Sequence, residues 1–338
     1  MLPRWLPHLL VGLLPVLTFL GALLYLDSYK LVNLRTVVAT VGAGALVAVA
    51  SYFLNGALLS ATGMDFQSYS RYVAPLSEEV LKGLVILAMI RLGRVGFLVD
   101  AAILGFAVGA GFSILENVYY LLFLVSQDAG IGTWIIRGFG TAIMHGGATA
   151  IFSVTSLNFT DHPSRRGALV LAPGVLLAYV VHSLYNHMFL PPIYQTFVVM
   201  VTLPLLLMAV FRQSEKAVGS WLGSGFDTDA RLLELLNSGQ FSDAPLGKYV
   251  STLKQKFHGP IVADILCYVR LHTELALRAK GVLMMRENGF EAPIDQPTRD
   301  KFTELRYLEG SIGKTGRMAI RPMLHMNRKD LWQLYLLE

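Results

Sequence analysis

Charged side chains interrupt a segment that is otherwise as apolar as lipid. In APLSEEVLKGLVILAMI, residues 74–90, Glu78, Glu79 and Lys82 stand among mainly aliphatic residues. An ionised carboxylate in the hydrocarbon core of a bilayer is costly, and a buried ion pair is a poor way to gain stability. Acids in such a segment therefore indicate catalysis, ion binding or proton transfer.

Polar residues recur in three later apolar segments. GFSILENVYY contains Glu116, GTAIMHGGATA contains His145, and YVVHSLYNHMF contains His182 and Asn186. Because lipid does not tolerate such side chains, we expect them to face one another. With a rise of about 1.5 Å per residue, all of them, together with the acids of residues 74–90, would lie roughly 10–20 Å below one membrane surface. The sequence thus predicts a single polar site in the outer half of the membrane.

Helical spacing places several of these residues on shared faces. Three pairs are four residues apart: Glu78 with Lys82, Phe112 with Glu116, and His182 with Asn186. The lysine can then lie over a carboxylate, and an aromatic ring can lie beside an acid. Glycines flank the same motifs, at positions 105, 109, 111, 146 and 147. Small residues of this kind allow helix backbones to approach closely in a membrane.

The three glutamates and one lysine would carry a net charge of −2 if all were ionised. Either protons shared between carboxylates or a divalent cation must cancel this charge. Carboxylate and imidazole ligands together suit zinc. If zinc is bound, we expect Glu116, His145 and His182 to be its ligands. One of Glu78 or Glu79 would then stay free to activate water.

Helices of a membrane protein must position these residues. The chain is 54% hydrophobic and 15% charged, with a mean hydropathy of +0.53, which is typical of a polytopic membrane protein. Seven segments are long enough to span: about 5–26, 37–60, 71–90, 97–124, 132–157, 168–190 and 193–211. We therefore predict an all-α bundle of about seven spans over residues 1–212. The net charge of +5 does not indicate nucleic acid as a partner.

Residues 213–338 are rich in charge and predict a helical domain, regulatory or substrate-docking, with one helix over about 260–289. The Lys and Arg residues near segment ends divide unevenly between the two sides: Lys30, Arg35, Arg91, Arg94, Arg165, Arg166, Arg212 and Lys216 on one, Arg4 and Arg71 on the other. Basic residues favour the cytoplasmic side. We expect a multi-pass protein of the cell membrane with its N-terminus outside and its C-terminal domain in the cytoplasm. The single cysteine, Cys267, excludes an internal disulfide.

In these motifs the chain resembles the PrsW family of intramembrane proteases. The family pattern is E-E-x-x-K, then F-x-x-x-E-N, then a histidine within a helix, then H-x-x-x-N/H. The matching residues are Glu78, Glu79, Lys82, Phe112, Glu116, Asn117, His145, His182 and Asn186. The resemblance covers roughly residues 70–190. The wider clan of Abi and CAAX-processing proteases is similar, but usually has histidine where this chain has Glu116.

The resemblance implies a peptidase that cuts membrane-bound anti-sigma factors on the extracytoplasmic side. It further implies that a glutamate activates water while histidine and asparagine stabilise the oxyanion. We expect Glu79 to be the general base and Glu78 to be held by Lys82, although the two roles could be exchanged. His182 and Asn186 would stabilise the oxyanion. Arg137 is interpreted as an interfacial anchor.

Three other classes of protein remain open on the sequence alone. A metal-dependent lipid amidase or other membrane hydrolase would use the same acids and histidines. A proton-coupled transporter would also bury such groups, but would need a polar path to the cytoplasmic face. A non-catalytic scaffold would not need them. The expected partners are a single-pass membrane protein substrate, such as an anti-sigma factor, and membrane lipid.

Overall fold

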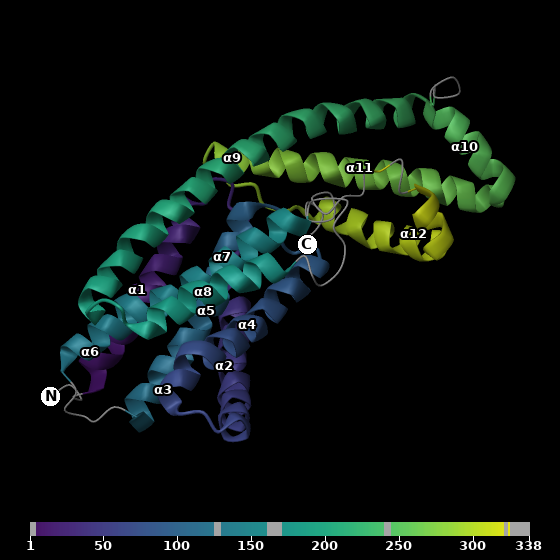
Figure 1. The fold of residues 1–338 in the computed structure, drawn as a ribbon. Helices are drawn as coiled ribbons and strands as arrows, with labels where there is room; N and C mark the ends of the chain where they lie inside the picture. Colours follow the sequence, from purple (N-terminus) through teal and green to yellow (C-terminus); the bar gives the residue numbers. More distant parts are fainter. Residues whose placement is uncertain (1–4, 125–129, 161–170, 240–244, 321–323, 325–338) are drawn as a thin grey trace. The chain divides into compact units, whose positions relative to one another are not determined.

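The computed structural model describes residues 5–124, 130–160, 171–239, 245–320 and 324. Within these residues the chain forms helices and no strands, which confirms the all-α prediction (Figure 1). Arg4, Arg165, Arg166 and the first residues of the predicted segment 168–190 lie outside the described residues.

Each predicted membrane segment coincides with helical structure. In chain order the elements are α1 Trp5–Leu26, α2 Leu34–Thr62, α3 Phe66–Ser68, η1 Tyr69–Val73, α4 Ala74–Arg91, α5 Leu98–Tyr119, η2 Tyr120–Leu124, α6 Ile131–Ile135, η3 Ile136–Thr141, α7 Ala142–Thr160, α8 Ala172–His187 and α9 Pro192–Ser238. Local signals mark several ends: the Asn33 side chain accepts from the Thr36 amide at the start of α2, and Gly63 ends that helix with φ 63°.

Four helices in the described part are long and apolar enough to cross a membrane: Leu6–Leu26, Leu34–Thr62, Leu98–Phe123 and Pro192–Ser238. α4 carries four charged residues in its 18, and α8 has only 16 residues. The chemistry of the site thus makes some of its own helices less apolar. Four spans are supported by length and composition, and seven spans stay a prediction.

α5 is the centre of the membrane part, and every residue from Val99 to Ser113 is buried. It packs most extensively against α7 and α2. A Cβ on Gly109 would lie 2.2 Å from the carbonyl oxygen of His145, and a Cβ on Gly111 would lie 1.9 Å from that of Val41. The predicted role of small residues is confirmed here: glycine lets α7 approach α5 at His145.

A wide helical turn, η1, leads into α4. Such turns leave backbone carbonyls without the usual partner along the helix. The Ser70 carbonyl accepts a hydrogen bond from Asn186 Nδ2 at 2.9 Å, and the Arg71 carbonyl accepts one from Ser183 Oγ at 2.6 Å. These contacts fasten the start of α4 to α8, so the acids of α4 come to face His182 of α8.

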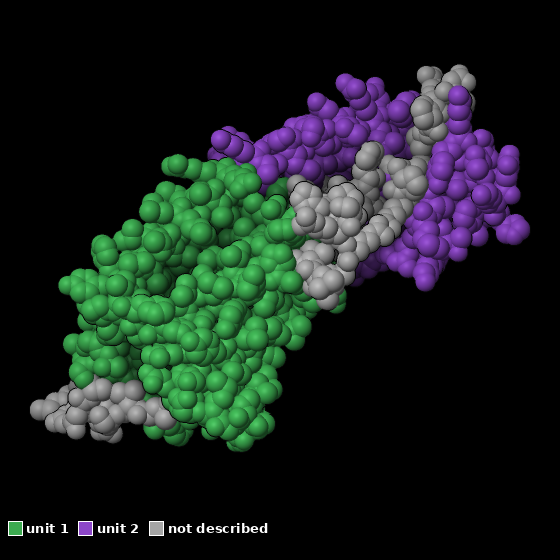
Figure 2. Space-filling view, in the orientation of Figure 1, with its two compact units in different colours: residues 1–27, 31–215 green, residues 28–30, 216–338 purple. Residues whose placement is uncertain are grey.

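The chain divides into two compact units, residues 1–27 with 31–215 and residues 28–30 with 216–338 (Figure 2). The second unit contains the end of α9 and then α10 Pro245–Lys256, α11 Gly259–Glu287 and α12 Gln296–Ile320. α11 matches the helix predicted over 260–289, with Pro260 in its first turn and Gly289 just beyond its end. Its apolar core includes Val269, Leu275 and Phe302.

The second unit also buries polar groups. Lys280 pairs with Asp229 and lies 5.0 Å from the centre of the Trp221 ring. His272 is buried, and its Nε2 has no hydrogen-bond partner among the described residues. Burial, together with the charge of Lys280, lowers the pKa of His272 to about 4. This histidine is therefore neutral in the folded unit at neutral pH.

Candidate active site

Glu79 and Lys82 form an ion pair inside the bundle. The Lys82 ammonium lies 2.5 Å from Glu79 Oε1, and both side chains are 0% exposed. The sequence predicted Lys82 beside Glu78, four residues away, whereas the structure pairs it with Glu79, three residues away. Glu78 turns instead toward α2, where Asn55 Nδ2 donates to its Oε1 at 3.1 Å. Both spacings suit a helix, and the groups opposite α4 decide between them.

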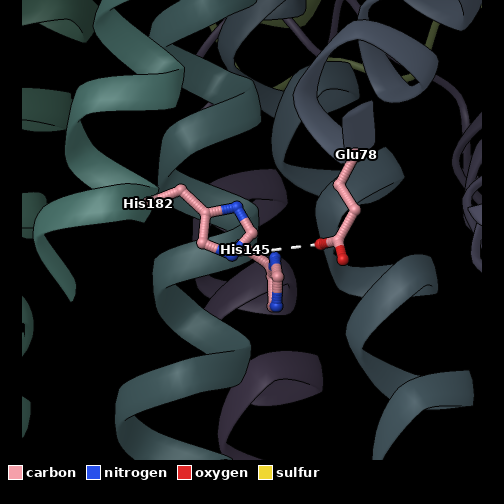
Figure 3. Close-up of side chains that lie close together, drawn as sticks. All are labelled: Glu78, His145 and His182. Atoms are coloured by element: carbon pink, nitrogen blue, oxygen red, sulfur yellow. Dashed lines mark ion pairs between the residues drawn. The ribbon is translucent and has the colours of Figure 1, made fainter. Parts of the chain in front are cut away.

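His182 of α8 lies between the two acids. Its Nδ1 is 2.8 Å from Glu79 Oε1. Its Nε2 is 3.9 Å from Glu78 Oε2, the pair joined by the dashed line in Figure 3. A carboxylate that accepts from one ring nitrogen fixes the tautomer and the orientation of the imidazole. With a proton on Nδ1, the lone pair of Nε2 points toward Glu78.

His145 of α7 lies on the other side of His182, with their ring centres 4.6 Å apart. Its Nδ1 is 3.1 Å from the Lys82 ammonium, and its Nε2 is 3.2 Å from Glu116 Oε2. Phe112 of α5 closes this corner, since its ring centre is 5.0 Å from the His145 ring and 4.5 Å from Lys82 Nζ. The Phe112 ring therefore packs against both Lys82 and His145, and Phe112 lies on the same helix as Glu116.

Arg137 of η3 belongs to this cluster, although the sequence interpretation made it an interfacial anchor. Its Nη2 lies 3.5 Å from Glu116 Oε2, its Nε donates to Asn117 Oδ1 at 2.9 Å, and its guanidinium lies 3.5 Å from the centre of the Tyr120 ring. Asn117 in turn donates to the Gly12 carbonyl of α1 at 2.9 Å. The signal that could have revealed Arg137 was a permanent charge inside a predicted span.

The described hydrogen bond of Asn186 goes to a backbone carbonyl and not to one of the acids. Its amide nitrogen donates to the Ser70 carbonyl of η1, as described above. Although His182 and Asn186 lie on the same face of α8, His182 contacts the acids of α4 and Asn186 contacts the backbone of η1. The oxyanion role predicted for Asn186 stays a prediction, and its observed contact is a structural one.

Glu78, His145 and His182 each offer a ligand atom, and these atoms all lie within 4.8 Å of one another (Figure 3). Glu79 is paired with Lys82, and Glu116 faces Arg137, whereas the described contacts of Glu78 are with a neutral amide and a histidine. Adding Arg137 to the predicted cluster reduces its net charge from −2 to −1. A carboxylate that has no ion pair with a Lys or Arg among the described residues, beside two imidazoles, is a donor set that suits zinc.

The sequence predicted Glu116, His145 and His182 as the metal ligands, whereas the group in the structure contains Glu78 with the same two histidines. Glu116 is nevertheless close, because its Oε2 lies 3.2 Å from His145 Nε2. Its side chain is 27% exposed and that of Glu78 is 15% exposed, so both side chains are partly accessible, unlike that of Glu79. The two carboxylates are therefore competing candidates for a metal ligand, and the structure groups Glu78 with both histidines.

The described helices bury acids, imidazoles and a lysine around a group that could hold a metal ion, an arrangement that suits a hydrolase embedded in a membrane. A family model described as PrsW family intramembrane metalloprotease matches residues 33–211, more than half of the chain. The chain belongs to this family and is an intramembrane peptidase. No curated protein and no solved structure matches the chain at the level required for a reliable relationship.

Proposed function

We propose that this protein is an endopeptidase that cuts a single-pass membrane protein, of the anti-sigma-factor kind, near the extracytoplasmic side of the cell membrane. The observation that carries the proposal is the convergence of Glu78, Glu79, His145 and His182 from three separate helices. Such a cluster inside an apolar bundle has a large energetic cost and needs a chemical reason. The family match supplies the reaction class, which is peptide hydrolysis.

Glu78, His145 and His182 would hold a zinc ion. Zinc lowers the pKa of a bound water and polarises a substrate carbonyl. Glu79 orients one of these ligands, His182, because its Oε1 contacts His182 Nδ1. The same oxygen accepts a hydrogen bond from the Lys82 ammonium. This arrangement keeps the second ring nitrogen of His182 available to a ligand.

Glu79 is the proposed general base, as expected from the sequence. Its Oε2 is buried and has no hydrogen-bond partner in the described structure. This oxygen would take a proton from the attacking water as the water oxygen bonds to the peptide carbonyl carbon. The proton would then pass to the leaving amide nitrogen as the C–N bond breaks. Lys82 holds the Glu79 carboxylate in one orientation.

The exposure of Glu116 and Glu78 supports access for a substrate segment from the membrane. A substrate helix must locally unwind for its peptide bond to reach the carboxylates, because helical backbone groups are already hydrogen-bonded. Arg137 keeps Glu116 beside His145 at this edge of the cluster. Glu116 would then position the substrate or the water.

The proposed orientation has the N-terminus outside and the C-terminal domain in the cytoplasm. Two contacts support it: the Val99 amide at the start of α5 donates to Ser214 Oγ of α9, and the loop residue Tyr29 donates to Glu287 of α11. Each joins segments that the basic residues assign to the cytoplasmic side. Reporters fused after residue 338 and in the loop after the fourth predicted span should lie on opposite sides. Reporters on the same side would contradict the seven-span arrangement.

The decisive experiment combines cleavage of a co-expressed single-pass substrate with zinc analysis of purified protein. Glu79→Gln should abolish cleavage but keep about one zinc per chain, whereas Glu78→Gln should lose both. Glu116→Gln compares the two candidate carboxylate ligands, because it should keep zinc if Glu78 is the ligand. Glu304→Gln, on the exposed side of α12, is the control. Full cleavage by zinc-free protein would overturn the metal assignment, and full cleavage by Glu79→Gln would overturn the proposed base.

A further inference from the structure

Asn55 of α2 lies outside every motif of the family pattern and yet contacts the site directly. Its Nδ2 donates to Glu78 Oε1 at 3.1 Å. Its Oδ1 accepts from the Tyr69 hydroxyl at 2.9 Å and lies 2.5 Å from Ser77 Oγ. The Asn55 amide thus links α2 to η1 and to α4, where it contacts Glu78.

The orientation of this amide follows from its neighbours. If the amide were reversed, its oxygen would face Glu78 at the same distance, and with Glu78 ionised, as a metal ligand must be, two acceptors would meet without a proton between them. The Tyr69 hydroxyl supplies a proton to Oδ1, and the Tyr69 side chain is buried. Ser77 Oγ is also within reach of the Ala74 carbonyl at 2.9 Å, so Tyr69 is the donor committed to Asn55. The N–H group is therefore turned toward Glu78.

We propose that Asn55 is a positioning residue that holds Glu78 with one oxygen directed at His182. Asn55 occupies Oε1, whereas Oε2 faces His182 Nε2 at 3.9 Å, as Figure 3 shows for the two side chains. This inference rests on the proposed function, in which Glu78 is a ligand. Glu79 and Glu116 are each held by a cationic side chain, and Glu78 is held by this neutral amide.

A neutral partner has a specific advantage at this position. A Lys or Arg beside Glu78 would cancel the negative charge that attracts a metal ion, while an amide orients the carboxylate and leaves that charge in place. Losing such an outer partner typically weakens metal affinity or activity about 10- to 100-fold. Asn55 should therefore affect zinc binding and turnover without touching the substrate.

The test replaces Asn55 with leucine, which has a similar size and no hydrogen-bonding groups, in the full-length protein. Zinc affinity is measured by competition with a chromogenic chelator, and cleavage kinetics with a single-pass substrate. Asn55→Leu should weaken zinc about 10- to 100-fold and lower kcat with KM unchanged. Ser60→Ala removes an exposed hydroxyl of the same helix whose described hydrogen bond is to the Gly56 carbonyl, and it should match the wild type in both measurements.

The same substitution in a Glu78→Asp background, which keeps a carboxylate for zinc but withdraws it by one methylene from Asn55 and so leaves a measurable affinity and rate, separates positioning from a general structural effect. Because Asn55 acts through Glu78, the second substitution should add nothing to the loss already caused by the first. Wild-type zinc affinity and kcat in Asn55→Leu, or an equal loss in both backgrounds, would overturn the proposal. A wild-type protein that cleaves without zinc would leave kcat and the double substitution as the deciding measurements. A wild-type protein that neither binds zinc nor cleaves would overturn the proposed function and this inference with it.

Discussion

Replacing Lys82 with methionine would remove the one ammonium group from the centre of the cluster. The Lys82 side chain is 0% exposed and contacts Glu79 Oε1 at 2.5 Å, His145 Nδ1 at 3.1 Å and the face of Phe112 at 4.5 Å. Methionine keeps most of the volume and the apolar contacts of the stem. The substitution therefore removes the charge with little change in packing.

The expected cost follows from the burial of Glu79. At 2.5 Å and an effective dielectric constant of 20, the direct attraction of the two charges is about 7 kcal/mol. Desolvation of both ions cancels much of it, so a buried pair contributes little relative to an apolar pair. Removing one partner leaves the other charge uncompensated, which costs about 3–5 kcal/mol. Lys82→Met should therefore lower the free energy of unfolding by this amount.

The assay compares the thermal unfolding of the purified full chain with the rate of substrate cleavage. For a protein of 150–250 residues, 1 kcal/mol corresponds to about 2–4 °C, and somewhat less is expected for a longer chain. Lys82→Met alone should lower Tm by at least about 5 °C and abolish cleavage. The double variant Lys82→Met/Glu79→Gln removes the orphaned charge, so it should recover most of the stability. It should remain inactive, because it lacks the proposed base.

Two results would refute this reasoning. If Lys82→Met unfolds at the wild-type temperature, Glu79 does not depend on Lys82 for charge compensation, and another cation or a proton must hold it. If the double variant cleaves substrate, Glu79 is not the base. Glu304→Gln controls for a general effect of removing a carboxylate. Glu304 is exposed on α12 of the second unit, more than 100 residues along the sequence from the cluster.

Three further predictions concern other parts of the structure. Arg137→Gln should lower kcat about tenfold, which corresponds to roughly 1.4 kcal/mol, since it removes the cation that pairs with Glu116. Arg137→Lys should recover part of kcat in the same cleavage assay. Gly109→Ala should destabilise the membrane part by about 1–3 kcal/mol, because its Cβ would meet a backbone carbonyl of α7; Gly42→Ala, with nothing within 4 Å, should not lower Tm. Folding lowers the pKa of His272 from 6.5 to about 4. The contribution of neutral His272 to the free energy of unfolding is therefore fully present above pH 6.5, and up to roughly 3 kcal/mol of it is lost as the pH falls toward 4. His272→Leu should show a smaller fall in Tm between pH 7 and pH 5, and an equal fall would contradict this origin.

The sequence by itself determined where most of the helices lie, and it indicated the acids and histidines that gather at one site. Hydrophobic periodicity and helix-ending residues are local properties, so segments such as 5–26 and 260–289 were placed within a few residues of α1 and α11. The cost of charge in hydrocarbon is equally independent of fold detail, which is why Glu78, His145 and His182 could be assigned to one site from their positions alone.

The tertiary structure decided which partner each polar group takes. Lys82 can reach an acid three or four residues away, and only the placement of Asn55 and His182 opposite α4 assigns it to Glu79. Arg137 and Asn55 lie on other segments, and no spacing rule relates them to the acids. The choice between Glu78 and Glu116 as a companion of both histidines likewise depends on distances across helices. Long-range partners follow from how whole helices pack, and helix packing is set by many small contacts that no single motif contains.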